Sequence, residues 1–286
     1  MSEPTLFPEG GFLRLKIKLA YDGTNFSGWA KQPDRRTAQE EFEKAFSTVS
    51  RHQCESIVAG RTDAGVHATA QIIHVDVPEG IDLSDLAYRL NRLLDIDLRV
   101  LEIEVAPEGF HARFSALRRH YKYQIVDGNK AINPLDRYDR ASWYRPLDLA
   151  RLNEASALLL GEHDFAAFCK FREGATTIRT LETFHWERKE DGLLVAQVVA
   201  DAFCYSMVRN LVGSAVCVAE GRFEPSWIAE MLANRERISD SMVFPAEGLT
   251  LVQVDYPDNA ELIARAALTI SRRGEDYRGT HRCTRS

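Results

Sequence analysis

The stretch Ala59-Gly60-Arg61-Thr62-Asp63-Ala64-Gly65-Val66-His67-Ala68 separates two segments with the character of strands. Residues 56–59 before its turn are mostly apolar, and residues 69–77 after it alternate between apolar and polar types. Glycine permits tight or positive-φ turns, so the stretch predicts a sharp loop between two strands. A loop of this kind holds Asp63 outside the core of the sheet.

The local chemistry of this loop leaves two interpretations open. In the first, Arg61 and Asp63 form a surface ion pair in an ordinary turn, which contributes at most about 1 kcal/mol. In the second, Asp63 is a catalytic carboxylate, and Arg61 keeps it ionised and holds substrate oxygens or phosphate.

Around the loop, hydrophobic periodicity predicts a β-α-β-β-α-β order for the first half of the chain. The expected elements are strands over residues 12–20, 56–59, 69–77 and 98–105, and helices capped by Thr37 and Ser84. The second helix is expected to turn Leu86, Leu90, Leu93 and Leu94 toward the core. This order is that of a ferredoxin-like unit, in which Asp63 lies on the central β-β connection.

The second half of the chain repeats this order with one added helix. The expected elements are strands over residues 114–126, 178–188, 193–200 and 249–255, and helices after Asp148, over residues 203–219 and from Pro225. We therefore predict an α+β protein of two related ferredoxin-like units with mainly antiparallel sheets and a catalytic cleft between them. The units cover residues 12–106 and 110–256, and residues 257–286 form a tail that is partly helical or disordered.

Composition limits the class of protein. The 286 residues are 45% hydrophobic, which suits a globular protein, and no run of 18 apolar residues or export signal appears. We expect a cytoplasmic protein without membrane contact. The five cysteines are widely spaced, so reduced packing thiols are expected. No metal-binding or nucleotide-binding motif occurs, which predicts a reaction without metal or cofactor.

Basic and aromatic residues gather between the two predicted units. Residues 110–123 contain Arg113, Tyr121 and other basic and aromatic side chains but no acid, although the chain has a net charge of −6. This mixture indicates an RNA groove, or alternatively a solvated basic edge strand. Arg209 interrupts an apolar helix, so it either meets a structural partner or faces solvent, a carboxylate or a phosphate.

The loop at 59–68 resembles the active-site motif of the tRNA pseudouridine synthase I (TruA) family. Further matches follow in the same order, at Tyr21-Asp22-Gly23, Gly28-Trp29, residues 110–116, 119–123, 207–213 and 245–249. Together they span about residues 12–256. Ala30 and Leu94-Asp95 depart from the family pattern outside the catalytic motif.

The resemblance implies an isomerase that converts uridine to pseudouridine at positions 38, 39 and 40 of the tRNA anticodon arm. It implies a homodimer that binds tRNA rather than DNA and needs no cofactor. Asp63 corresponds to the nucleophilic aspartate of the family, and Arg61 to the arginine that pairs with it. Tyr121 corresponds to the tyrosine that contacts the uridine, and Arg113 and Arg209 to the tRNA-binding surface. A noncatalytic RNA-binding module is the alternative.

Overall fold

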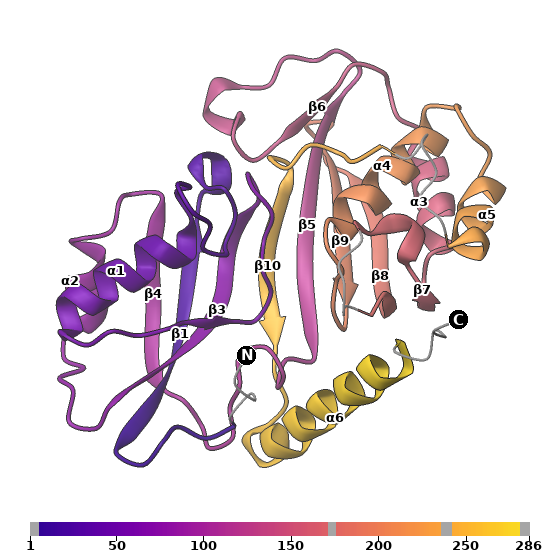
Figure 1. Ribbon diagram of the computed structural model, residues 1–286. Coiled ribbons are helices and arrows are strands. Elements are labelled where there is room, and N and C mark those ends of the chain that lie inside the picture. Colours follow the sequence, from indigo (N-terminus) through magenta and orange to yellow (C-terminus); the bar gives the residue numbers. More distant parts are fainter. Residues whose placement is uncertain (1–5, 171–175, 236–241, 281–286) are drawn as a thin grey trace. The chain divides into compact units, whose positions relative to one another are not determined.

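The computed structural model describes residues 6–170, 176–235 and 242–280, with side chains described as far as Ser271. The chain divides into two compact units (Figure 1). Unit 1 comprises residues 1–117 and 252–286, and unit 2 comprises residues 118–251. Unit 2 is therefore an uninterrupted insertion in the sequence of unit 1.

Unit 1 is built on a sheet in which β4, β1 and β3 are neighbours in that order, paired antiparallel, and β2 pairs with β3. Its elements are β1 (Phe12–Tyr21), η1 (Gly23–Asn25), α1 (Ala38–Ser50), β2 (Ile57–Val58), β3 (His67–Pro78), α2 (Leu86–Asn91), β4 (Leu98–Val105), η4 (Asn259–Glu261) and α6 (Leu262–Thr280). The last strand, β10 (Leu249–Asp255), begins in unit 2 and ends in unit 1.

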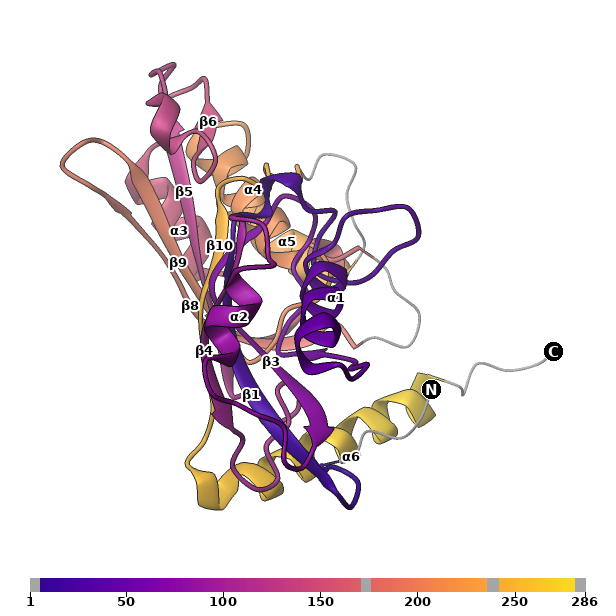
Figure 2. The ribbon, with the colours of Figure 1, turned by 90° about the vertical axis from the view of Figure 1, so that its left-hand side faces the viewer.

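The core of unit 1 lies between its sheet and two helices. Leu15, Ile17 and Leu19 alternate along β1 and are fully buried, and α1 and α2 lie on one face of the strands (Figure 2). Phe42 and Phe46 of α1 are also fully buried. The predicted cap of α1 is confirmed, because the Thr37 hydroxyl accepts a hydrogen bond from the Glu40 amide at 3.4 Å.

Unit 2 has a sheet with the order β5-β9-β8-β7, antiparallel throughout, and β6 pairs parallel to β5. Its elements are β5 (Arg118–Asp127), η2 (Pro134–Asp136), β6 (Ala141–Trp143), α3 (Leu149–Ala157), β7 (Gly161–Asp164), η3 (Ala166–Phe168), β8 (Ile178–Arg188), β9 (Leu194–Ala200), α4 (Met207–Ala219) and α5 (Ser226–Asn234). Helix α4 is buried along nearly its whole length and packs against α3.

Two predicted element starts and one predicted core residue are wrong. The strand expected from residue 114 begins only at Arg118, because the amides of residues 112–114 bond to histidine side chains instead of a neighbouring strand. The helix expected from residue 203 begins at Met207, after Ser206 takes a φ of 60°. Leu93 was expected in the core but is 52% exposed, since α2 ends at Asn91.

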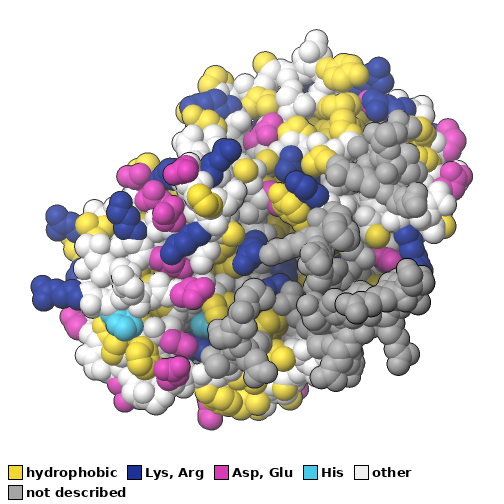
Figure 3. All heavy atoms as spheres, viewed as in Figure 1, with side chains coloured by type: hydrophobic (Ala, Val, Ile, Leu, Met, Phe, Trp, Pro, Cys, Tyr) yellow, Lys and Arg dark blue, Asp and Glu magenta, His cyan; other side chains and the backbone are white. Residues whose placement is uncertain are grey.

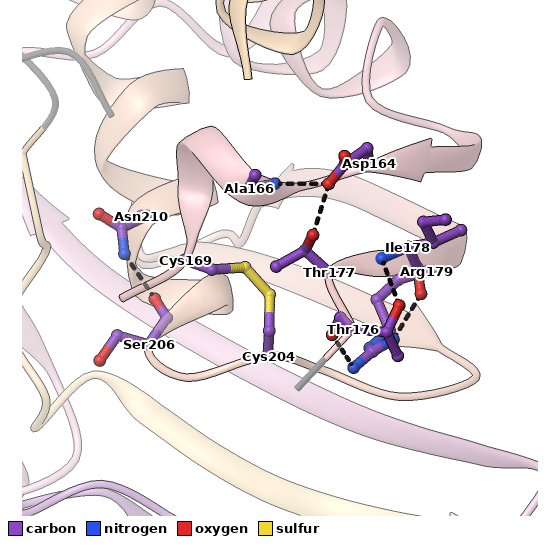
Figure 4. Close-up of a disulfide and its surroundings, with 10 residues drawn as sticks. All are labelled: Asp164, Ala166, Cys169, Thr176, Thr177, Ile178, Arg179, Cys204, Ser206 and Asn210. Carbon is purple, nitrogen blue, oxygen red and sulfur yellow. Dashed lines mark hydrogen bonds between the residues drawn. A yellow bond between two sulfur atoms is a disulfide. The ribbon is translucent and has the colours of Figure 1, made fainter. Parts of the chain in front are cut away.

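The expectation that all cysteines are reduced is also wrong. Cys169 and Cys204 form a disulfide, with Cα atoms 5.8 Å apart, between the end of η3 and the segment before α4 (Figure 4). Cys54 and Cys217 are free thiols, and Cys283 lies outside the described residues. Wide spacing in the sequence did not reveal a pair that folding brings together.

We expect reduction of this disulfide to lower the free energy of unfolding by about 2 to 4 kcal/mol. The bond joins residues 35 apart, and its loss frees the unfolded chain. Denaturant titrations with and without reductant measure the change. Cys169→Ser should abolish the dependence on reductant, and Cys54→Ser should retain it. A further loss of stability when Cys169→Ser is reduced would contradict the assignment.

Candidate active site

The predicted loop connects β2 to β3 in unit 1 and carries side chains of three different exposures. Thr62 is buried, Asp63 is half-buried and Arg61 is exposed. The Val66 amide donates to the Asp63 carbonyl at 3.2 Å, which closes the turn. The loop thus anchors Thr62 in the protein and leaves the neighbouring Asp63 half-buried.

A buried network of hydrogen bonds lies beneath this loop. The hydroxyls of Tyr21 and Thr62 are 2.8 Å apart, and the Gln71 amide donates to the Tyr21 hydroxyl at 3.1 Å and to the Gly60 carbonyl at 2.8 Å. Burial raises the pKa of Tyr21 to about 12, so its hydroxyl stays protonated. Since unpaired buried polar groups are costly, these contacts determine where Thr62 lies, next to Asp63.

A second loop, residues 22–29, supports the main chain of the first. The Trp29 amide donates to the Thr62 carbonyl at 3.1 Å, and the Gly65 amide donates to the Phe26 carbonyl at 3.3 Å. Gly28 has a φ of +94°, and a Cβ there would lie 2.8 Å from the Thr62 carbonyl oxygen. Only glycine allows this approach. Phe26 and Trp29 are buried and anchor the second loop in the core.

Arg113 also belongs to unit 1, in the segment that precedes β5. Within segment 110–116, all of which the structure describes, Arg113 alone is exposed. Its guanidinium carbon lies 5.6 Å from the centre of the Phe114 ring. The first part of the predicted basic stretch, residues 110–116, is therefore a buried turn that presents Arg113, and the strand β5 begins only after it, at Arg118.

Tyr121 and Arg209 belong to unit 2. Tyr121 is buried on β5, and its ring meets the ring of Phe203 edge to face at 5.1 Å. Arg209, in the first turn of α4, donates from Nε to the Phe244 carbonyl at 2.7 Å, and the Phe244 amide returns a bond to the Arg209 carbonyl at 3.1 Å. Of the alternatives that the sequence left open for Arg209, the structure shows a structural partner, the Phe244 backbone.

Two observations bear on whether the described part of the chain holds a charged patch or a metal site elsewhere. On the face shown in Figure 3, basic and acidic side chains are interspersed rather than gathered by sign. Among the described residues, no three His, Cys, Asp or Glu side chains are grouped as a metal site would need. None of the helices in the described part of the chain is long and apolar enough to cross a membrane.

Comparison with known proteins gives matches over most of the chain. The family model described as tRNA pseudouridine synthase matches residues 18–115 and 155–257, which include the Asp63 loop. The chain belongs to the tRNA pseudouridine synthase family. A relative from Frankia casuarinae, tRNA pseudouridine synthase A, is 51% identical over 260 residues, which cover 91% of this chain and 95% of that protein.

Two further relatives with the same description agree. The protein from Streptomyces griseus is 51% identical over 266 residues, covering 91% of this chain and 93% of its own length. The protein from Mycobacterium leprae is 46% identical over 272 residues, covering 90% and 94%. The predicted family is confirmed, and with it the activity: the chain is an isomerase that converts uridine to pseudouridine in tRNA.

Sequence reasoning missed the residues that support this pseudouridine synthase loop from below. Gln71 occupies an inward position of β3 and is fully buried, and a polar residue at an apolar position of an alternating strand was its available signal. Tyr21 was quoted only as part of a family motif. In the structure, the Tyr21 hydroxyl bonds to Thr62 and the Gln71 side chain bonds to the Gly60 carbonyl, so both residues hold the loop in place.

We expect Tyr21→Phe and Thr62→Val each to lower turnover and to reduce the free energy of unfolding by about 1 kcal/mol. Each removes one hydroxyl of the buried network under Asp63. Because the hydroxyls share a hydrogen bond, the double variant should lose less stability than the sum of the single losses. Denaturant unfolding and steady-state kinetics measure both effects.

A matched control is Thr48→Val on α1, whose exposed hydroxyl bonds to the Lys44 carbonyl of the same helix. This variant should keep normal turnover. Strictly additive stability losses from Tyr21→Phe and Thr62→Val would show that the two hydroxyls do not act together.

Proposed function

We propose that the Asp63 carboxylate is the nucleophile of uridine isomerisation, at positions 38, 39 and 40 of the tRNA anticodon arm. The observation that carries the proposal is the architecture of its loop, where Thr62 is tied into a buried network and the adjacent Asp63 is half-buried. Rigid support of one residue holds the next in a defined position for attack. An ordinary surface turn has no need of such support.

The reaction requires few groups. The N1–C1′ bond of uridine breaks, the uracil turns, and a C5–C1′ bond forms. The proton leaves C5 and N1 gains one, so atoms and electrons balance without redox change or hydrolysis. A carboxylate nucleophile and a proton acceptor near C5 suffice. Arg61 lies two residues before Asp63 and is exposed, and we assign its guanidinium to hold substrate oxygens or phosphate.

Access to the base requires that the uridine leave the RNA stack. We assign Tyr121 to contact with the flipped uridine, with Phe203 supporting its ring edge to face. Arg113 provides an exposed guanidinium for the RNA backbone. Arg209 contributes to the tRNA surface through the segment at Phe244, whose backbone it holds.

The proposal also includes the domain organisation, the oligomeric state, the location and the cofactor requirement of the enzyme. The order β1-α1-β2-β3-α2-β4 in unit 1 supports a ferredoxin-like unit, and β5-α3-β8-β9-α4-β10 supports a second. We assign residues 12–106 and 110–256 to these two ferredoxin-like repeats. The enzyme works as a cytoplasmic homodimer and uses no cofactor.

We expect Asp63→Asn to abolish pseudouridine formation while tRNA affinity and stability stay close to those of the wild type, because the amide keeps the shape but cannot act as the nucleophile. Unmodified tRNA with uridines in the anticodon arm is incubated with each protein, and pseudouridine is mapped by position.

A matched control is Asp95→Asn, which removes one charge from a side chain that is 74% exposed in the same unit. It should convert tRNA at the normal rate. Conversion by Asp63→Asn would refute the nucleophile, and conversion confined to other tRNA positions would refute the assignment to 38, 39 and 40.

A further inference from the structure

Segment 110–116 is held by side chains from three other parts of unit 1. Arg14 of β1 donates to the Phe110 carbonyl at 2.9 Å, and the Tyr256 hydroxyl donates to the Ala112 carbonyl at 2.7 Å. His74 of β3 accepts the Ala112 amide at its Nδ1, at 3.1 Å. The backbone of this turn is therefore bonded to side chains at the places where a strand would bond to its neighbour.

His111 continues this pattern inside the segment. Its Nδ1 accepts the Arg113 amide at 3.2 Å and the Phe114 amide at 3.1 Å, and its ring centre lies 4.8 Å from that of His74. Both histidines are 1% exposed. Two imidazoles thus bind three consecutive amides, with Arg113 at the middle one.

This arrangement works only with neutral imidazoles. An Nδ1 that accepts a hydrogen bond carries no proton, so the ring proton of each histidine lies on Nε2. Burial, with the charge of Arg14 adding to it, lowers the pKa of His74 well below its usual value. Burial and the charges of Arg14 and Arg113 lower the pKa of His111 to about 4, and Asp76 opposes the shift.

The fixed backbone supports an exposed charge. Arg113 lies over Phe114, and the Phe114 ring in turn packs on the His111 ring with centres 4.4 Å apart. A guanidinium whose backbone and aromatic support are already ordered loses less entropy when it binds phosphate. The rest of the segment is buried and contributes position rather than contact.

We propose that His74 and His111 are positioning residues that hold Arg113 in place to bind a phosphate of the tRNA backbone. The inference rests on the proposed function, since it takes tRNA as the bound ligand of Arg113. It adds two residues that do not touch RNA and act through the amides of Ala112, Arg113 and Phe114.

The test is the salt dependence of tRNA binding. Each phosphate contact adds about 0.7 to 0.9 to the slope of log affinity against log salt concentration. Arg113→Gln should lower this slope by about that amount, and His111→Phe, which keeps a ring but no acceptor, should lower it equally. The double variant should show no further decrease, because both changes remove the same contact.

Two comparisons separate positioning from general destabilisation. His111→Asn, which offers an oxygen acceptor near the place of Nδ1, should restore much of the slope. Leu90→Ala removes a fully buried side chain of α2 and lowers stability, yet should keep the wild-type slope. In Arg113→Gln, His111→Phe and the double variant, tRNA affinity should fall and KM should rise, whereas kcat should change less.

A wild-type slope in folded His111→Phe, or in Arg113→Gln, would overturn the proposal while leaving tRNA conversion by the wild type intact. Failure of the wild type to bind or convert tRNA would instead refute the proposed function. Should His111→Phe fail to fold, His74→Leu in the same salt series decides, since it removes the acceptor of the Ala112 amide alone.

We also expect the stability of the protein to fall as pH drops from about 6.5 toward 4. Over this window the unfolded chain takes up a proton at His111 that the folded chain excludes, so acid favours unfolding. Each pKa unit of difference changes the unfolding equilibrium constant about tenfold. Unfolding titrations across this range should show a shallower pH dependence in His111→Phe, and an unchanged dependence would contradict the neutral, buried imidazole.

Discussion

The two hydrogen bonds that the Tyr21 hydroxyl makes, one with Thr62 and one with Gln71, are the constraint on which the loop at residues 59–68 depends. They join a strand end, a loop and the neighbouring strand at one buried point, where water cannot replace a lost partner. The second loop then meets the same stretch through its main chain at Trp29 and Gly28. The backbone on both sides of Asp63 is therefore held by its neighbours.

The same principle recurs at segment 110–116 with different groups. There the backbone is bonded to imidazole, hydroxyl and guanidinium side chains rather than to another strand. In both turns, hydrogen bonds from buried polar side chains hold the backbone in a conformation that regular secondary structure would not give. In each turn, the residue to which we assign a role in the reaction or in tRNA binding lies beside or between the anchored positions, Asp63 in one and Arg113 in the other.

Much of the fold of unit 1 could be predicted from the sequence, because hydrophobic periodicity indicates which residues of a strand or helix are buried. The alternation in β1 and the cap at Thr37 placed the first strand and helix, and the motif at 59–68 placed Asp63 on its loop. Long-range partners were not accessible. The pairing of Cys169 with Cys204 and the reach of His74 to Ala112 join residues 35 and 38 apart, which local pattern does not report. The strand predicted from residue 114 began too early for the same reason, because the bonds from the amides of residues 112–114 to His74 and His111 are long-range or local side-chain contacts that periodicity does not report.

The order of the two units along the chain has a consequence for synthesis. Unit 2 is continuous in sequence, whereas unit 1 needs residues 252–286 to be complete. Chains emerge from the ribosome N-terminus first, so unit 2 has all its residues before Tyr256 and Leu262 can join the cluster around Phe110. The packing around the turn at residues 110–116 thus cannot be completed until after the whole of unit 2 has been synthesised.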